Sequence, residues 1–169
     1  FIPGLDSDRF NSKGWIHDGA GSPYEFKIGN SYAGAFRIDN YSIPGLRLSV
    51  SGYGGNSFNN TLYPQTNSRY KGVKGTVLIG AFDFTYDAHN WIIRGNFDYG
   101  HLTDADVITA FNGSMPASSV SAKQAVASDA IATGIEAGYD LFSFSPKLHA
   151  RGQKFHLFGR YEYYDSMFK

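Results

Sequence analysis

The chain has 169 residues, no cysteine, and 15 basic against 15 acidic side chains. The lack of cysteine excludes disulfide scaffolds and thiolate chemistry, and the balanced charge gives no support for nucleic-acid binding, which needs a basic surface. Aromatic residues make up 17% of the chain, with 20 glycines, a composition typical of β-structure with many turns. We expect an all-β protein, and no apolar run approaches the roughly 18 residues of a transmembrane helix.

The first expected element is a loop. Residues 1–23 have no stable hydrophobic period, and we expect Trp15 and Ile16 to anchor them. Residues 24–28 alternate between apolar and charged side chains. Two alternatives therefore stay open: the first strand is very long, or residues 29–30 turn a further short hairpin.

Three hairpins are predicted next, because their strands carry large apolar side chains at every second position. The expected pairs are 32–39 with 46–54 around a turn at 42–45, 76–86 with 91–100 around a polar turn at 87–90, and 135–141 with 155–164 around a connection at 143–153.

Long connections are expected at 55–75 and 101–134. The alanine-rich part of the second predicts a short helix, with Ser118 or Ser119 as its N-cap. This helix either folds inward and narrows a pore or belongs to a surface loop.

Charged side chains occupy the other parity of the same strands. We expect the following residues to line a hydrated interior: Arg37, Asp39, Arg47, Asp83, Arg94, Asp98, Glu136, Asp140, Arg160 and Glu162. The apolar parity is expected to face lipid through Phe36, Ile38, Leu48, Phe82, Phe84, Trp91, Ile93, Phe97, Tyr99, Leu157 and Tyr161. In a water-soluble sheet, the same alternation would separate a core from solvent.

Three observations favour lipid over a core. The connections alternate between short and long, as in outer-membrane barrels. Each strand has about ten residues, close to the 9–11 that cross a bilayer at a tilt and longer than the 5–6 common in soluble proteins. Tyr and Trp gather at strand ends, as in interfacial girdles. We therefore expect an antiparallel up-and-down transmembrane β-barrel. Residues 1–169 would be a single domain that supplies about six strands of a larger barrel.

The chain offers no chemistry of its own. None of the five histidines has a partner at metal-ligand spacing, and neither a P-loop nor a nucleophile elbow is present. Glu136 and Asp140 lie about 13 Å apart on one strand face, too far for paired-carboxylate hydrolysis. We expect no enzyme activity, no metal and no cofactor.

Three segments carry a family resemblance: IEAGYDLF (135–142), FGRYEYYDSM (158–167) and GNFDYG (95–100). They resemble strands of outer-membrane porins of Gram-negative bacteria, including the phosphate-selective porin O/P-like group. The resemblance implies a passive channel in the outer membrane, with membrane lipid and small hydrophilic solutes as partners and a homotrimer as the assembly.

Such barrels have about 16 strands, so the chain is expected to be a fragment; it also ends at Lys169 without a terminal aromatic strand. The charged parity holds nearly balanced charge, so phosphate selectivity is not implied. Two alternatives to a conducting porin stay open: a soluble secreted β-sandwich that binds glycans, and a non-conducting surface barrel or adhesin.

Overall fold

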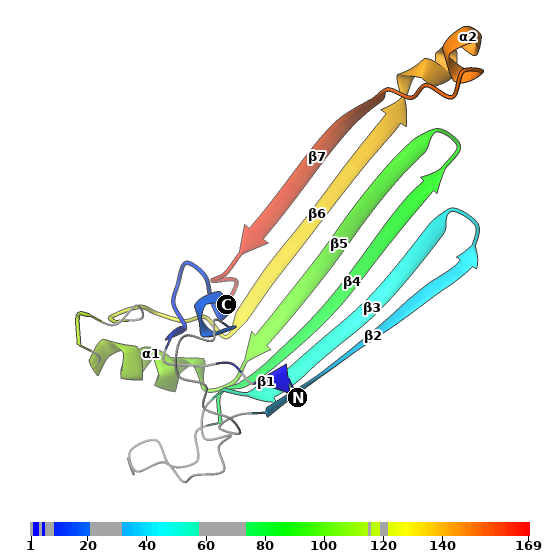
Figure 1. Cartoon of the computed structure of the whole chain (residues 1–169). Coiled ribbons are helices and arrows are strands. Elements are labelled where there is room, and N and C mark those ends of the chain that lie inside the picture. Colours follow the sequence, from blue (N-terminus) through cyan, green and yellow to red (C-terminus); the bar gives the residue numbers. More distant parts are fainter. Residues whose placement is uncertain are drawn as a thin grey trace.

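The structure is a computed structural model that describes residues 2–3, 5, 9–20, 32–57, 74–114, 116–118 and 122–169. It contains one antiparallel sheet in which every strand pairs with its neighbours along the chain (Figure 1). Its strands, in sheet order, are β1 (Ile2–Pro3), β2 (Tyr32–Ile43), β3 (Leu46–Asn56), β4 (Thr76–Ala88), β5 (Trp91–Leu102), β6 (Asp129–Asp140) and β7 (His156–Asp165). The predicted antiparallel up-and-down topology is confirmed, but the sheet is not closed.

The three predicted hairpins are confirmed, and their strands run for 10 to 13 residues. Pro44 and Gly45 turn the first hairpin, where Gly45 has a φ of 79°. His89 and Asn90 turn the second with φ angles of 52° and 67°. Two successive positive φ angles are typical of a type I′ turn, whose twist matches that of the flanking strands.

The expected loop at 101–134 is wrong over much of its length. Helix α1 (Ala105–Ser114) follows β5 almost at once, and residues 129–134 form the first half of β6. They do so because β5 continues to Leu102, so that residues 96–101 of β5 pair with 129–134.

The predicted helix near Ser118 is also wrong, since Ser118 lies in a turn and Ser119 is outside the described residues. The helix lies earlier because Asp104 reverses the chain with a φ of 59° and its carbonyl accepts the amide of Ile108 at 3.0 Å.

Smaller differences concern the other connections. The expected loop at 1–23 contains β1 and the 3-10 helix η2 (His17–Ala20), and Gly55 and Asn56 belong to β3. The 3-10 helix η4 (Leu141–Phe144) and the short helix α2 (Pro146–His149) occupy the last connection. The two alternatives for residues 24–30 lie outside the described residues, as does 58–73. In the described part of the chain, no helix has the length and apolarity that crossing a bilayer would need.

The hydrophobic core lies at one end of the sheet, beside the long connections. An N-terminal segment (residues 9–20) lies with α1 at this end (Figure 1). Trp15 and Ile16 are 6% and 9% exposed, so their predicted anchoring role is confirmed. Phe10 and Ile108 are fully buried beside them. The sheet supplies three further buried members of this cluster, which are Val77, Leu102 and Ala130.

Hydrogen bonds join the N-terminal segment to the residues just before β6 and just after β7. The indole Nε1 of Trp15 donates to the carbonyl of Ala127 at 3.1 Å. The Ser166 hydroxyl, just beyond β7, donates to the carbonyl of Ser12 at 2.8 Å. The start and the end of the described chain therefore meet at the same end of the sheet.

Gly100 is needed where Trp15 packs on β5. A Cβ built on Gly100 would overlap the six-membered ring of the indole, whereas a Cβ on Gly80 in β4 has no heavy atom within 4 Å. Both glycines lie in strands of the same sheet, but only Gly100 has a side chain packed against it.

We expect Gly100→Ala to lower the free energy of unfolding by about 1–3 kcal/mol, the cost of overpacking. Gly80→Ala is the control and should be neutral or slightly stabilising. Urea titration followed by tryptophan fluorescence would measure both. Equal midpoints for the two variants would contradict the packing of Trp15 on β5.

Candidate functional site: the charged face of the sheet

The strand register gives the sheet two chemically different faces. All ten residues predicted to line a hydrated interior lie on one side, here called the charged face. All eleven residues predicted to face lipid lie on the other side, here called the apolar face. Neighbouring strands pair without a change of parity along β3–β7, so the alternation seen in each strand extends across the sheet.

Two neighbouring rows of residues cross the charged face. The cationic row runs through Arg47, Thr85, Arg94, Glu136 and Arg160. The acidic row runs through Asp39, Ser49, Asp83, Asn96, Gly134 and Glu162. The rows are two residues apart along each strand, or about 7 Å.

Asp83 joins the rows on the β2–β4 side of the sheet. Its Oδ1 accepts hydrogen bonds from Nη2 of Arg47 at 2.9 Å and from Nη2 of Arg37 at 3.2 Å. Arg37 also donates to Asp39 at 3.0 Å. Because these side chains come from three strands, the network forms only in this register.

Ser49 completes the network, and sequence reasoning missed it. Its side chain is 1% exposed. Its hydroxyl accepts from Nη2 of Arg37 at 2.8 Å and donates to Asp39. A serine among charged residues carries no signal of its own; only its parity, shared with Arg47, could have placed it here.

The β5–β7 side of the face is less tightly paired. Arg94 and Glu136 are cross-strand partners, but their nearest charged atoms are 3.9 Å apart. Arg160 pairs with Glu162 of its own strand, and both side chains are 62% exposed. Asp98 accepts a 2.6 Å hydrogen bond from Asn96. The charges here are open to solvent and to a ligand.

A shallow hollow of about 310 Å³ lies over this part of the sheet. Its charged and polar lining comes from Arg47, Asp83, Thr85, Arg94, Asn96, Glu136, Arg160 and Glu162. Phe84, Gly95, Gly134 and Ile135 complete the lining. Cations and carboxylates thus face one space, which suits water and hydrophilic solutes better than an apolar ligand.

Asp140 has a different role from the other charged residues. It is 1% exposed, and its Oδ1 accepts the backbone amides of Phe142 at 3.0 Å and Phe155 at 2.9 Å. It caps η4 and fixes the connection to β7, so its contacts are structural.

The charged face loses its charge at the long-connection end, which was also unexpected. Val77 and Leu102 face each other across β4 and β5 on the parity of the charged residues, and both are buried under the N-terminal segment. The signal was present in the sequence, because Val77 and Ile79 interrupt the polar parity of β4.

The apolar face is uncovered by any other part of the described chain. Phe36, Ile38 and Leu157 are 59%, 66% and 63% exposed. Phe82 and Phe97, paired across β4 and β5, are 41% and 45% exposed. Of the expected lipid-facing residues only Leu48, Phe84 and Ile93 are half-buried.

Aromatic side chains with polar partners lie at both ends of this face. At the tight-turn end the ring of Trp91 packs 4.8 Å from that of Tyr139, and the Tyr86 hydroxyl lies 2.7 Å from Nδ1 of His89. At the other end the Tyr99 hydroxyl bonds to Asp129. Tyrosine rings whose hydroxyls have polar partners are suited to a boundary between apolar and aqueous phases.

Comparison of the chain with protein-family models, curated proteins and solved structures finds no match. The residues that the structure describes also contain no group of three or more His, Cys, Asp or Glu side chains that could hold a metal ion. The charged face is therefore interpreted from its own geometry.

A stability measurement tests whether the contacts of Asp140 are structural. We expect Asp140→Ala to cost about 0.5–2 kcal/mol of stability, because two backbone amides lose their acceptor. Asp98→Ala is the matched control on the same face and should cost less than about 0.5 kcal/mol. Urea unfolding measures both, and equal losses would show that the capping contacts of Asp140 carry no special weight.

Proposed function

We propose that this chain forms part of an outer-membrane porin of a Gram-negative bacterium, a water-filled channel for passive diffusion of small hydrophilic solutes or ions. The observation that carries the proposal is the two-faced sheet. One face is apolar and uncovered from β2 to β7, and the other holds hydrogen-bonded charges. Soluble monomers rarely expose continuous apolar patches of this extent, whereas hydrocarbon satisfies them.

The strand lengths support this placement. Ten to 13 residues extend roughly 33–44 Å at about 3.3–3.4 Å per residue. A bilayer core of about 30 Å is crossed by 9–11 residues at a tilt. The aromatic residues at both ends of the apolar face then lie at the two interfaces.

The open edges require more strands. Strands β3 to β6 are paired on both sides, but in lipid every backbone N–H and C=O needs a partner, so an open sheet is not viable there. The smallest single-chain barrels have about eight strands. The proposal therefore includes further strands, from the same protein or from other copies of it, of which a homotrimer is one arrangement.

The charged face would line the channel. A cationic row beside an acidic row produces a local field across the path of a solute, and it offers both donors and acceptors to polar groups. The near balance of charge favours neither strong anion nor strong cation selectivity. Arg94 and Glu136 form the loosest pair, and the exposed Arg94, Arg160 and Glu162 are open to a passing solute.

A second candidate, a non-conducting surface barrel, is favoured by one observation. The N-terminal segment and α1 bury the charged face at the long-connection end. A barrel blocked there would insert in the membrane without passing ions. Conductance separates this candidate from a porin.

Two neighbouring residues on opposite faces test the membrane placement. We expect Phe82→Arg to lower the free energy of unfolding in lipid vesicles by about 2–4 kcal/mol, the cost of Arg facing mid-bilayer lipid. Ala81→Arg places the same charge on the charged face, beside Asp98, and should cost far less. Urea titration in vesicles gives both values. A chain that folds as a monodisperse protein without detergent or lipid would instead support the soluble β-sandwich.

Planar-bilayer recording tests conduction. We expect stepwise conductance, and we expect Arg94→Glu with Arg160→Glu to shift the reversal potential in a KCl gradient toward cation selectivity. Lys13→Glu with Lys74→Glu adds the same negative charge away from the hollow and is the control. An unchanged reversal potential in the arginine variant would overturn the lumen assignment. Insertion without conductance would favour the non-conducting barrel.

A further inference from the structure

The connection between β6 and β7 is basic. We call residues 141–155 the basic connection. It contains Lys147, Arg151 and Lys154 together with His149, and it has no Asp or Glu. In a chain with equal numbers of acidic and basic residues, this segment holds a local excess of positive charge, as does the connection at 57–75.

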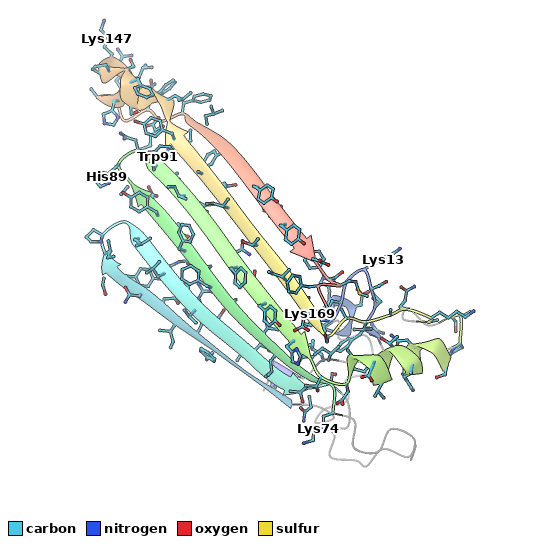
Figure 2. All side chains as sticks on the ribbon, turned by 180° about the vertical axis from the view of Figure 1, so that it is seen from behind. Lys13, Lys74, His89, Trp91, Lys147 and Lys169 are labelled. Carbon is cyan, nitrogen blue, oxygen red and sulfur yellow. The ribbon has the colours of Figure 1, made fainter. Side chains whose placement is uncertain are left out.

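The basic connection lies at the tight-turn end of the sheet and projects beyond the other two hairpins (Figure 1). Figure 2 shows Lys147 at this tip, while Lys13, Lys74 and Lys169 lie at the opposite end of the molecule. The side chains of Lys147, Arg151 and Lys154 are exposed. Among the described residues, none of the salt bridges involves them.

The carboxylate that immediately precedes the basic connection does not bind these cations. Asp140 is buried, and its side chain binds the backbone amides of Phe142 and Phe155. The positive charge of the basic connection is therefore directed to the surroundings of the protein.

Exposed apolar side chains accompany the charge. Phe144 and Phe155 are 74% and 53% exposed. The Phe144 ring lies 5.4 Å from that of Tyr139, which in turn packs against Trp91 on the apolar face. The basic connection is thus continuous with the aromatic end of the apolar face, and a partner must offer hydrocarbon beside negative charge.

We propose that the basic connection binds the anionic headgroups of the lipid leaflet that borders the tight turns. The aromatic rings lie at the level of the headgroups, and the ammonium and guanidinium groups reach their phosphates. The inference rests on the proposed function for its orientation, because the apolar face must meet the same leaflet. Lipid is the favoured source of phosphate because the cations project beside exposed rings and do not converge in a polar pocket.

Vesicle flotation tests this inference with the full chain. We compare neutral phosphatidylcholine vesicles with vesicles that contain phosphatidylglycerol, and we measure the partition coefficient. We expect Lys147→Gln with Arg151→Gln and Lys154→Gln to weaken binding to the anionic vesicles by about 100-fold, or roughly fivefold per basic residue. Binding to neutral vesicles should not change.

The matched control removes the same charge from the other end of the molecule, with Lys13→Gln, Lys74→Gln and Lys169→Gln. It should retain the preference for anionic vesicles. Lys147→Arg with Lys154→Arg keeps the charge and should bind like the unaltered chain, which separates loss of charge from loss of fold.

Three results would overturn the inference: equal weakening by both triple variants, no preference of the unaltered chain for anionic vesicles, or displacement by inorganic phosphate at matched ionic strength. The last would indicate a site for free phosphate. Failure of the proposed function looks different. The chain would then not bind neutral vesicles, but its binding to anionic vesicles would still depend on Lys147, Arg151 and Lys154.

Discussion

The register between neighbouring strands is the constraint on which the rest of this structure depends. A slip of one residue between two strands would move every side chain of one of them to the other face. The turns at Gly45 and Asn90 help to fix that register, because each requires a positive φ at a defined position. Asp83 then meets arginines of β2 and β3, and the large apolar side chains gather on one side.

The two ends of the sheet differ in what stabilises them. At the long-connection end, Trp15, Ile108 and Leu102 form a packed core that needs no outside medium. Toward the tight turns, the charged face is open and the apolar face is bare. The stability of this second region depends on what contacts Phe36, Phe82 and their neighbours, which is why the function proposed for the chain is a function in lipid.

The sequence predicted the hairpins and the two faces because alternation is local. The spacing of Phe82, Phe84 and Tyr86 defines a face whatever the rest of the chain does. By contrast, the first half of β6 has the sequence DAIATG, whose small side chains give little alternation; it is a strand because β5 needs a partner there. The position of helix α1 likewise depends on a tertiary contact, the burial of Ile108. This contact outweighs the higher intrinsic helix propensity of the alanine-rich stretch that follows α1.

Site details that depend on residues distant in the sequence could not be predicted either, because they too depend on tertiary contacts. Nothing near Ser49 in the sequence indicates that it will bridge Arg37 and Asp39. Asp140 has the parity of the charged face, but one of its two amide partners is Phe155, at the far end of the connection. Charge and period identify the face of a residue, while its partners follow from the packed structure.

The bond between Ser166 and Ser12 has a consequence for the order of events during folding. It joins residues 154 positions apart, whereas each hairpin joins near neighbours. Closing so long a loop costs more entropy than closing a hairpin, and nonlocal contacts form slowly. The N-terminal segment should therefore dock last, onto a sheet in which β2 to β7 have already paired.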